Sequence, residues 1–235
     1  MAKMVGLSRT IKLPWMDKTV ELMGQQLEES QFKDALNEYL SFEIGSPTVL
    51  RKTREILMHA WYYDEPETKA RRDMALDLIH KYPDDKLALH WCMILINYPV
   101  FQDLTRLIGK ITEFQDEFTL KQLKQKIFDE WGERATLFHS IDKIMATMKN
   151  FETIAADKPG KYHVVKHKVK SQEVIDFMIY TAMSVGGNSY YSVQDLKDLQ
   201  CLFPFEYQIS KETMASDDHF VLSNLGGQLS VGIKE

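Results

Sequence analysis

The sequence predicts an α+β protein that is mostly α-helical, and two observations carry this prediction. Residues 17–116 show one amphipathic helix after another, with apolar residues recurring three and four positions apart. Beyond residue 117, short alternating stretches and glycine-containing turns, which are typical of strands, occur between the helices. We therefore expect an N-terminal helical bundle over 17–116, a winged helix-turn-helix over 117–170, and a helix with short strands over 171–235.

Six helices are expected in the bundle, and prolines or capping residues mark most of their starts. They are expected over about 18–29, 32–40, 47–61, 66–81, 85–97 and 99–111. Pro47, Pro66 and Pro99 fit the first helical position, where a missing N–H costs no hydrogen bond. Ser46 is expected to cap the third helix and Asp84 the fifth. The short connections favour antiparallel neighbours in a compact bundle.

The winged helix-turn-helix is predicted from the order of elements in the next segment. A capping box opening at Thr119 starts a helix, Gly132 ends it, and a second helix follows over 134–150. A turn at Pro159 and Gly160 then leads into the strand "YHVVKHKV". In a winged helix the second helix enters the major groove and the hairpin lies along the DNA backbone.

Local charge favours DNA as the ligand of this segment. The whole chain carries 29 Lys+Arg against 34 Asp+Glu, which argues against a general polyanion binder. Residues 149–170 nevertheless hold six lysines against Glu152 and Asp157. The positive charge is concentrated where a wing would meet phosphate. The alternative is a hairpin whose lysines only keep a sheet edge soluble.

The expected DNA-binding residues come from the second helix, from the hairpin and from a separate basic turn. On the helix and its start they are Arg134, Thr136, Ser140 and Lys143. On the hairpin they are Lys158, Lys161, Lys166 and Lys168. In the first turns of the helix that begins at "SPTVLRKTRE" they are Arg51, Lys52 and Arg54. Cations there oppose the helix dipole, which indicates an anionic partner, although pairing with Glu43 or Glu55 would also explain them.

No catalytic or metal signature is complete in the sequence. It contains no phosphate loop, dinucleotide fingerprint, nucleophile elbow or His-Glu-x-x-His motif. His163 and His167 would share one face of a strand, but no Cys or carboxylate pair completes a zinc site. Asp217, Asp218 and His219 are interpreted as a polar loop. We expect no enzyme activity, no cofactor and no bound metal.

Cysteine usage and hydropathy favour a cytoplasmic protein. Cys92 and Cys201 lie far apart in apolar stretches, which is typical of buried thiols in a reducing compartment. The N-terminal residues lack the continuous apolar run of a signal peptide. The most apolar run, Trp91–Ile96, has six residues, whereas about 20 are needed to span a bilayer. We expect no membrane association.

A family resemblance covers about residues 30–155 and rests on three stretches. They are "SPTVLRKTREIL", "LHWCMILINYPVFQDLTRLI" and "FTLKQLKQKIFDEWGERATLFHSIDKIMATMKNFETI". Their order resembles the BrxA-like accessory proteins of bacterial BREX phage-defence systems. The resemblance implies a small, helical, non-enzymatic DNA-binding protein that serves a multi-subunit defence complex. Beyond Ser171 the chain is longer than the family leads us to expect.

Three functions remain open at this point. The leading hypothesis is an accessory protein that binds double-stranded DNA mainly through phosphate, with other subunits of a defence complex as partners. The second is an adaptor that docks other subunits without touching nucleic acid. The third is a transcription regulator that uses the same wing. Operator-binding regulators dimerise to match two half-sites, and no coiled-coil stretch supplies a dimer helix.

Overall fold

The computed structural model describes residues 6–225 and 228–234, and this part of the chain is a mostly helical α+β protein. The helices are α1 (Leu13–Met23), α2 (Glu29–Ser41), α3 (Pro47–Trp61), α4 (Pro66–Lys81), α5 (Lys86–Asn97), α6 (Pro99–Thr112), α7 (Leu120–Trp131), α8 (Ala135–Asn150), α9 (Gln172–Gly186) and α10 (Lys211–Ser216). The strands are β1 (Glu117–Thr119), β2 (Ile154–Lys158), β3 (Lys161–Val164), β4 (His167–Lys168), β5 (Tyr190–Ser192), β6 (Phe205–Glu206), β7 (Phe220–Leu225) and β8 (Gln228–Ile233). The predicted fold class is confirmed at this level.

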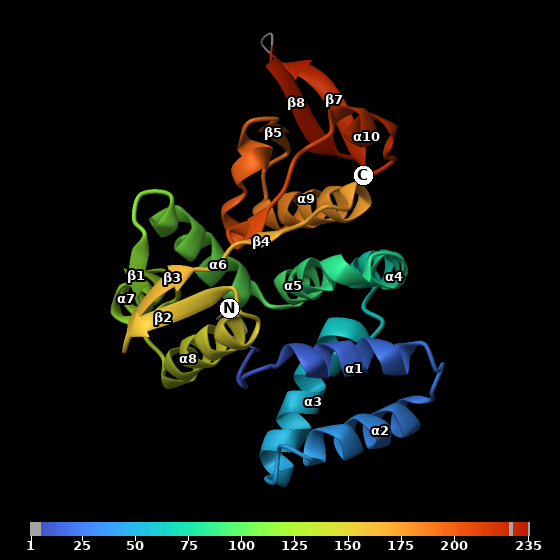
Figure 1. The fold of residues 1–235 in the computed structure, drawn as a ribbon, viewed down its shortest axis with the longest axis vertical. Coiled ribbons are helices and arrows are strands. Elements are labelled where there is room, and N and C mark those ends of the chain that lie inside the picture. The colour runs from blue at the N-terminus through green and yellow to red at the C-terminus, as the bar shows by residue number, and fades with distance from the viewer. Residues whose placement is uncertain (1–5, 226–227, 235) are drawn as a thin grey trace.

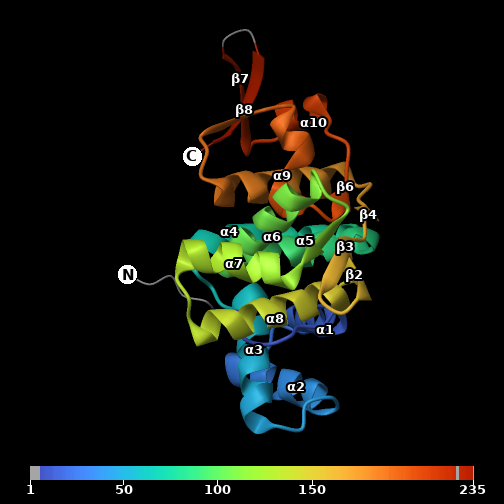
Figure 2. The same ribbon diagram turned by 90° about the vertical axis from the view of Figure 1, so that its left-hand side faces the viewer.

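The elements are stacked along the long axis of the molecule (Figures 1 and 2). Helices α2 and α3 lie at one end, and the β7–β8 hairpin projects from the other, above α9. Helices α6, α7 and α8 gather with β1, β2 and β3 on one side of the stack (Figure 1). That side carries the segment for which DNA binding is predicted.

Helix α5 is the centre of the core because it is apolar on all sides. Its residues from Ala88 to Leu95 are all buried, as expected for a helix without a solvent face. The Trp91 ring lies 4.8 Å from Phe101 and 5.7 Å from Phe205, measured between centroids, and its Nε1 donates to the carbonyl of Cys201 (2.9 Å). The C-terminal segment thus packs on the same core as the bundle.

The first helix starts earlier than the sequence led us to expect. It begins at Leu13 rather than Lys18, because Pro14 occupies its first turn, where proline is well tolerated. Leu7 and Ile11, in the extended segment before it, are buried, and the Ile11 N–H donates to the Thr147 hydroxyl on α8 (2.9 Å). The N-terminal segment therefore ties the bundle to α8.

Two expected helix caps differ in the structure. Ser46 precedes α3 but makes no side-chain cap bond. Asp84 does not cap α5, because Pro83–Asp85 forms a 3-10 turn before that helix. The Asp85 carboxylate instead accepts from the Ser171 N–H (3.0 Å), immediately before α9. Asp85, the neighbour of the expected cap Asp84, thus anchors the start of α9.

Residues 117–164 form a three-stranded antiparallel sheet with two helices. The strand order is β1-β3-β2, with Phe118 opposite Tyr162 and Ile154 opposite Val164. The capping box at Thr119 is present at the start of α7, as predicted. Gly132 ends α7 with a φ of +76°, a conformation that favours glycine.

The predicted strand "YHVVKHKV" is wrong beyond its first half. Strand β3 ends at Val164, and His167–Lys168 form a separate strand, β4, that runs parallel to β6. His163 and His167 therefore do not share a strand face. Pairing with a segment almost forty residues later overrides local β-propensity here.

The C-terminal segment forms a second three-stranded sheet in the order β5-β8-β7. Its last two strands, β7 and β8, are antiparallel neighbours, and residues 226–227 between them lie outside the described residues. The stretch "FPFEYQI" contains the two residues of β6, and Ser192 with Asp195 leads into a 3-10 turn. Among the described helices, none is long and apolar enough to cross a membrane.

Candidate nucleic-acid interface

The outer face of α8 presents a polar stripe. Thr136, His139 and Lys143 are spaced three and four residues apart and are all exposed, so they lie on one side of the helix. Ser140 was expected with them, but it is buried. Its position beside the buried Ile141 places it on the apolar side of the helix. Donors and acceptors on an exposed helix are the groups that read base edges in a major groove.

The charged residues of the β2–β3 hairpin differ in whether they have ion-pair partners. Lys158 and Lys161 are direct cross-strand partners. The Lys161 ammonium pairs with the Glu117 carboxylate on β1 (3.0 Å), and Asp157 pairs with His163 (2.9 Å). The Lys158 side chain is exposed and forms no hydrogen bond or ion pair within the described parts of the chain. One cation of the hairpin is therefore left for an external anion.

The hairpin turn lies against the start of α7. The Leu120 N–H donates to the Gly160 carbonyl (3.2 Å), and Thr119 pairs with Lys161 across the sheet. Lys121, exposed in the first turn of α7, therefore lies on the same side as the hairpin. The sequence analysis did not single out Lys121, because this turn-to-helix contact leaves no local signal.

Two of the predicted hairpin lysines lie elsewhere. Lys166 and Lys168 follow β3, where the chain has left the sheet. The Lys166 ammonium donates to the Phe203 carbonyl (2.7 Å), and Lys168 pairs with Glu206 in the β4–β6 ladder. Both residues therefore belong to the junction with the C-terminal segment and not to the hairpin.

The start of α8 carries a partly exposed aromatic pair. Arg134 is the half-buried N-cap residue, and its carbonyl accepts from the Phe138 N–H (3.0 Å). Phe138 is 42% exposed and stacks on Phe128 with 6.2 Å between ring centroids. The Lys124 ammonium lies 3.3 Å from the Phe138 centroid and pairs with Asp142 (2.6 Å). A cleft of about 670 Å³ runs alongside, between α7 and α8.

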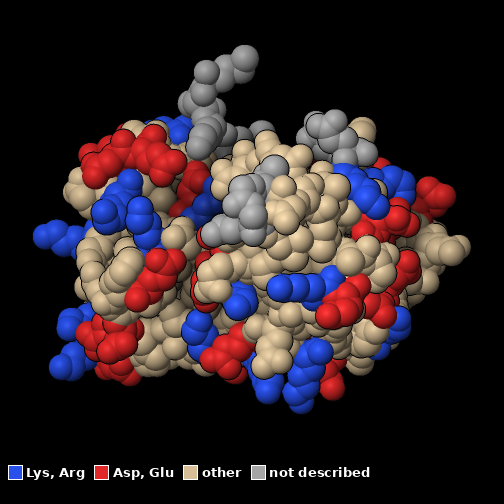
Figure 3. Space-filling view, turned by 90° about the horizontal axis from the view of Figure 1, so that it is seen from above, with Lys and Arg blue, Asp and Glu red and all other residues tan. Residues whose placement is uncertain are grey.

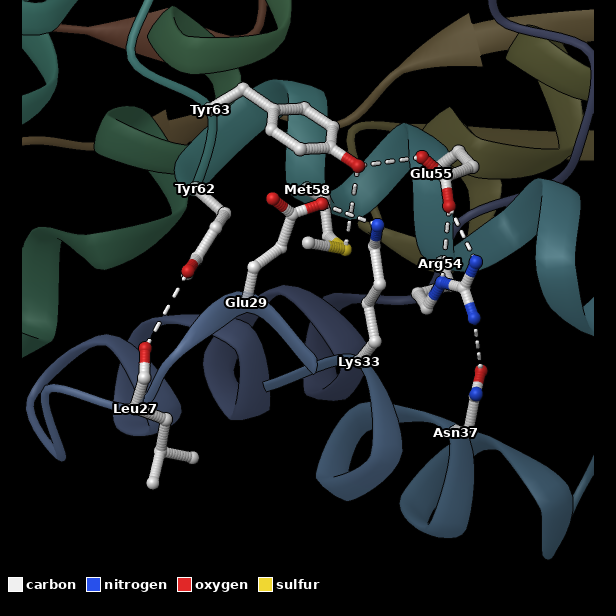
Figure 4. A network of polar contacts seen from close by, with 9 residues as sticks. All are labelled: Leu27, Glu29, Lys33, Asn37, Arg54, Glu55, Met58, Tyr62 and Tyr63. Carbon is white, nitrogen blue, oxygen red and sulfur yellow. Dashed lines mark hydrogen bonds and ion pairs between the residues drawn. The ribbon is translucent and has the colours of Figure 1, made fainter. Parts of the chain in front are cut away.

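Of the three residues in the predicted basic site on α3, Arg54 is engaged by neighbouring side chains (Figure 4). The Arg54 guanidinium binds the Glu55 carboxylate (2.6 Å) and the Asn37 side chain (3.2 Å) on α2. Burial would raise the pKa of Glu55, but hydrogen bonds from Arg54 and Tyr63 outweigh it and hold that pKa below its usual value. Arg54 thus links α2 to α3 and is not a free cation. This agrees with the alternative in which the basic residues of α3 pair with Glu55.

Arg51 and Lys52 are arranged differently from Arg54. Both are exposed on α3, and the described part of the protein offers neither a hydrogen-bond partner nor an ion-pair partner. They lie on the bundle, outside the α7–α8–hairpin unit.

Other chemistry-bearing groups do not assemble into a site. Cys92 and Cys201 are buried and free, and burial raises the pKa of Cys201 to about 11, which keeps the thiol protonated at neutral pH. Within residues 6–225 and 228–234, no three His, Cys, Asp or Glu side chains are placed to hold a metal ion. On the face seen in Figure 3, blue and red side chains alternate, without a broad field of one sign.

Comparison of the chain with protein-family models, with curated proteins and with solved structures finds no match.

Proposed function

We propose that residues 99–164 form a winged helix-turn-helix that binds duplex DNA. The chain order α6-β1-α7-α8-β2-β3 and the sheet order β1-β3-β2 support this proposal. Gly132 separates α7 from α8, and the Pro159-Gly160 turn closes the hairpin. In such a fold α8 is the helix that enters the major groove, and β2–β3 is the wing.

The observation that carries the DNA-binding proposal is the presence of unpaired cations on α7, α8 and the hairpin. Lys143, Lys158 and Lys121 are exposed on three neighbouring elements of this unit, and none has an ion-pair partner among the described residues. Phosphate contacts by such lysines supply affinity without sequence information. The polar stripe with Thr136 and His139 supplies groups that can read base edges.

We also propose that the protein is a non-enzymatic accessory component of a bacterial phage-defence system of the BREX type and acts in the cytoplasm. The resemblance of residues 30–155 to BrxA-like proteins supports this role. The C-terminal segment beyond Ser171, which that resemblance does not cover, packs on α5 and α6. Its β7–β8 hairpin projects from the end of the molecule (Figure 2). That hairpin is the surface for docking other subunits in this proposal.

Titration of unrelated duplexes over a salt series tests the DNA-binding proposal. Each phosphate contact adds about 0.9 to the slope of log K against log salt. The wild-type protein is expected to bind each duplex, with a slope of at least about 2.7 in magnitude, from one contact for each of the three lysines. Absence of binding at low salt, or a flat salt dependence, would contradict the proposal.

The adaptor function is the second candidate, and one observation favours it. Phe138 is 42% exposed beside a cleft between α7 and α8, and exposed aromatic side chains are common anchors in protein interfaces. If the protein acts only as an adaptor, Phe138→Ala weakens its assembly with other subunits. Replacement of Lys121, Lys143 and Lys158 then leaves the binding of duplex DNA unchanged.

A further inference from the structure

Two cations on α3 lack the anions that the sequence places nearest to them. The Glu55 carboxylate lies between Arg54 (2.6 Å) and the Tyr63 hydroxyl (2.8 Å), as Figure 4 shows. The side chain of Glu43 accepts from Trp15 Nε1 (3.0 Å) and pairs with Lys12. Both acids are thus engaged by other groups. Among the described residues, no other side chain forms an ion pair with Arg51 or Lys52.

These cations line a pocket of about 510 Å³ between α3, the N-terminal segment and the α5–α6 junction. Ile56, Tyr98 and Pro99 form an apolar wall of this pocket. Its volume lies within the range of small-ligand sites, roughly 300–1,000 Å³. The pocket therefore combines two cations with an apolar wall at the scale of one small molecule, and the carboxylates of Glu55 and Glu65 also belong to its lining.

The polar lining includes an acceptor without a partner. The Asn97 side-chain amide donates to the Met93 carbonyl (2.8 Å), and the described chain provides no donor to its side-chain oxygen. That oxygen is able to accept from the amino group of a ligand. Glu65, another acid of the lining, lies beside His59, with 3.7 Å between Oε1 and Nδ1.

We propose that this pocket binds a nucleotide, with its phosphate on Arg51 and Lys52. A guanidinium matches two phosphate oxygens with parallel N–H donors, and a neighbouring ammonium adds a point charge. The base lies along the apolar wall, and its amino group reaches Asn97. A pocket of this size admits a mononucleotide, whereas a duplex presents its phosphates on a convex surface about 20 Å wide that cannot enter it. The inference is independent of the DNA-binding proposal.

Calorimetric titration with ATP, AMP and inorganic phosphate tests this site. The wild-type protein is expected to bind ATP or AMP with Kd below about 1 mM and inorganic phosphate more weakly. The Arg51→Ala, Lys52→Ala double variant should lose at least about tenfold in nucleotide affinity, because hydrogen bonds to charged groups are strong. Lys211→Ala, which removes an exposed lysine from α10, is the matched control and should bind as wild type.

Three outcomes would overturn the proposal. The first is no nucleotide binding by the wild-type protein, and the second is equal binding by the double variant. The third is inorganic phosphate bound as tightly as ATP, which would leave the apolar wall without a role. Duplex DNA is titrated in parallel as a separate arm. If the double variant loses DNA affinity and no form binds nucleotide, Arg51 and Lys52 return to the DNA-binding surface.

Discussion

Lys158 and Lys161 face each other across the β2–β3 hairpin as direct cross-strand partners. Like charges in this position destabilise a strand pair, by about 0.2–1 kcal/mol. Only Lys161 is compensated, through the Glu117 carboxylate at 3.0 Å. The hairpin thus keeps an unfavourable charge at its end, which an anionic ligand would relieve.

Substitution of Lys158 should therefore shift stability and DNA binding in opposite directions. Lys158→Glu places opposite charges across the strands, so the free energy of unfolding should rise by about 0.2–1 kcal/mol. DNA affinity should fall, because one phosphate contact becomes a repulsion. Denaturant unfolding and duplex titration measure the two effects. Unchanged DNA affinity in the more stable variant would mean that Lys158 does not contact DNA and only keeps the hairpin soluble.

The helix break at Gly132 should depend on glycine for its backbone conformation. Gly132 has a φ of +76° and open space around it, so an added Cβ meets strain but no clash. Gly132→Ala should cost about 1–2 kcal/mol of unfolding free energy. Gly45→Ala is the control, since Gly45 also has open space but no positive φ. Equal stability of the two variants would show that the break does not require glycine.

The contact of α6 with the C-terminal segment should be intolerant of any side chain at Gly109. A Cβ there would lie 2.2 Å from the Gln200 carbonyl oxygen. Gly109→Ala should therefore destabilise the protein by about 1–3 kcal/mol or more, as overpacking does. Gly24→Ala, where the nearest atom is 3.4 Å away, should have little effect. Thermal unfolding of both variants gives the comparison.

His90 should make the protein less stable in mild acid. Its ring is fully buried, with Nε2 3.0 Å from Asp17 and Nδ1 without a partner in the described structure. Burial lowers its pKa from 6.5, and the hydrogen bond that Nε2–H donates to the Asp17 carboxylate only partly opposes this. Lys86, which also pairs with Asp17, and the Trp61 ring are the other groups beside it. The folded protein therefore keeps the imidazole neutral where the unfolded chain binds a proton.

The sign of this pH dependence follows from the lowered pKa. As the pH falls below 6.5, the unfolded state gains a proton that the folded state does not, so the free energy of unfolding falls by up to about 1.4 kcal/mol per pH unit. In His90→Gln this dependence between pH 6.5 and about 5 should disappear. Any loss at lower pH remains, because Asp17, whose pKa is lowered, titrates there. An unchanged slope in the variant would contradict the account.

Local signals in the sequence predicted the helices of this protein better than its strands. Prolines at helix starts and the capping box at Thr119 act within one turn, so α3, α4, α6 and α7 begin as expected. Strand β4 was misplaced because its partner, Phe205–Glu206, is distant in the chain. Hairpin lysines beyond Val164 were assigned to the wrong sheet for the same reason.

The candidate site was predicted in part, and burial explains the errors. Thr136 and Lys143 were expected on the outer face of α8 and are exposed there. Ser140 lies between them in sequence, yet its side chain is buried. A serine can lie on either face of a helix, so the sequence pattern did not indicate that it would be buried. Arg54 could not be separated from Arg51 and Lys52 by sequence, since its partners Glu55 and Asn37 are set by how α2 packs on α3.

Two charge-matched variants, compared by the salt dependence of their duplex binding, test whether α8 and the hairpin bind DNA. One variant combines Lys121→Ala, Lys143→Ala and Lys158→Ala, and the control combines Lys166→Ala, Lys168→Ala and Lys211→Ala. The first should bind DNA more weakly, with its log K against log salt slope reduced by about 2.7 for three lost phosphate contacts. The control, with the same loss of charge, should keep the wild-type slope. Equal slopes for the two variants would contradict DNA binding through α8 and the hairpin.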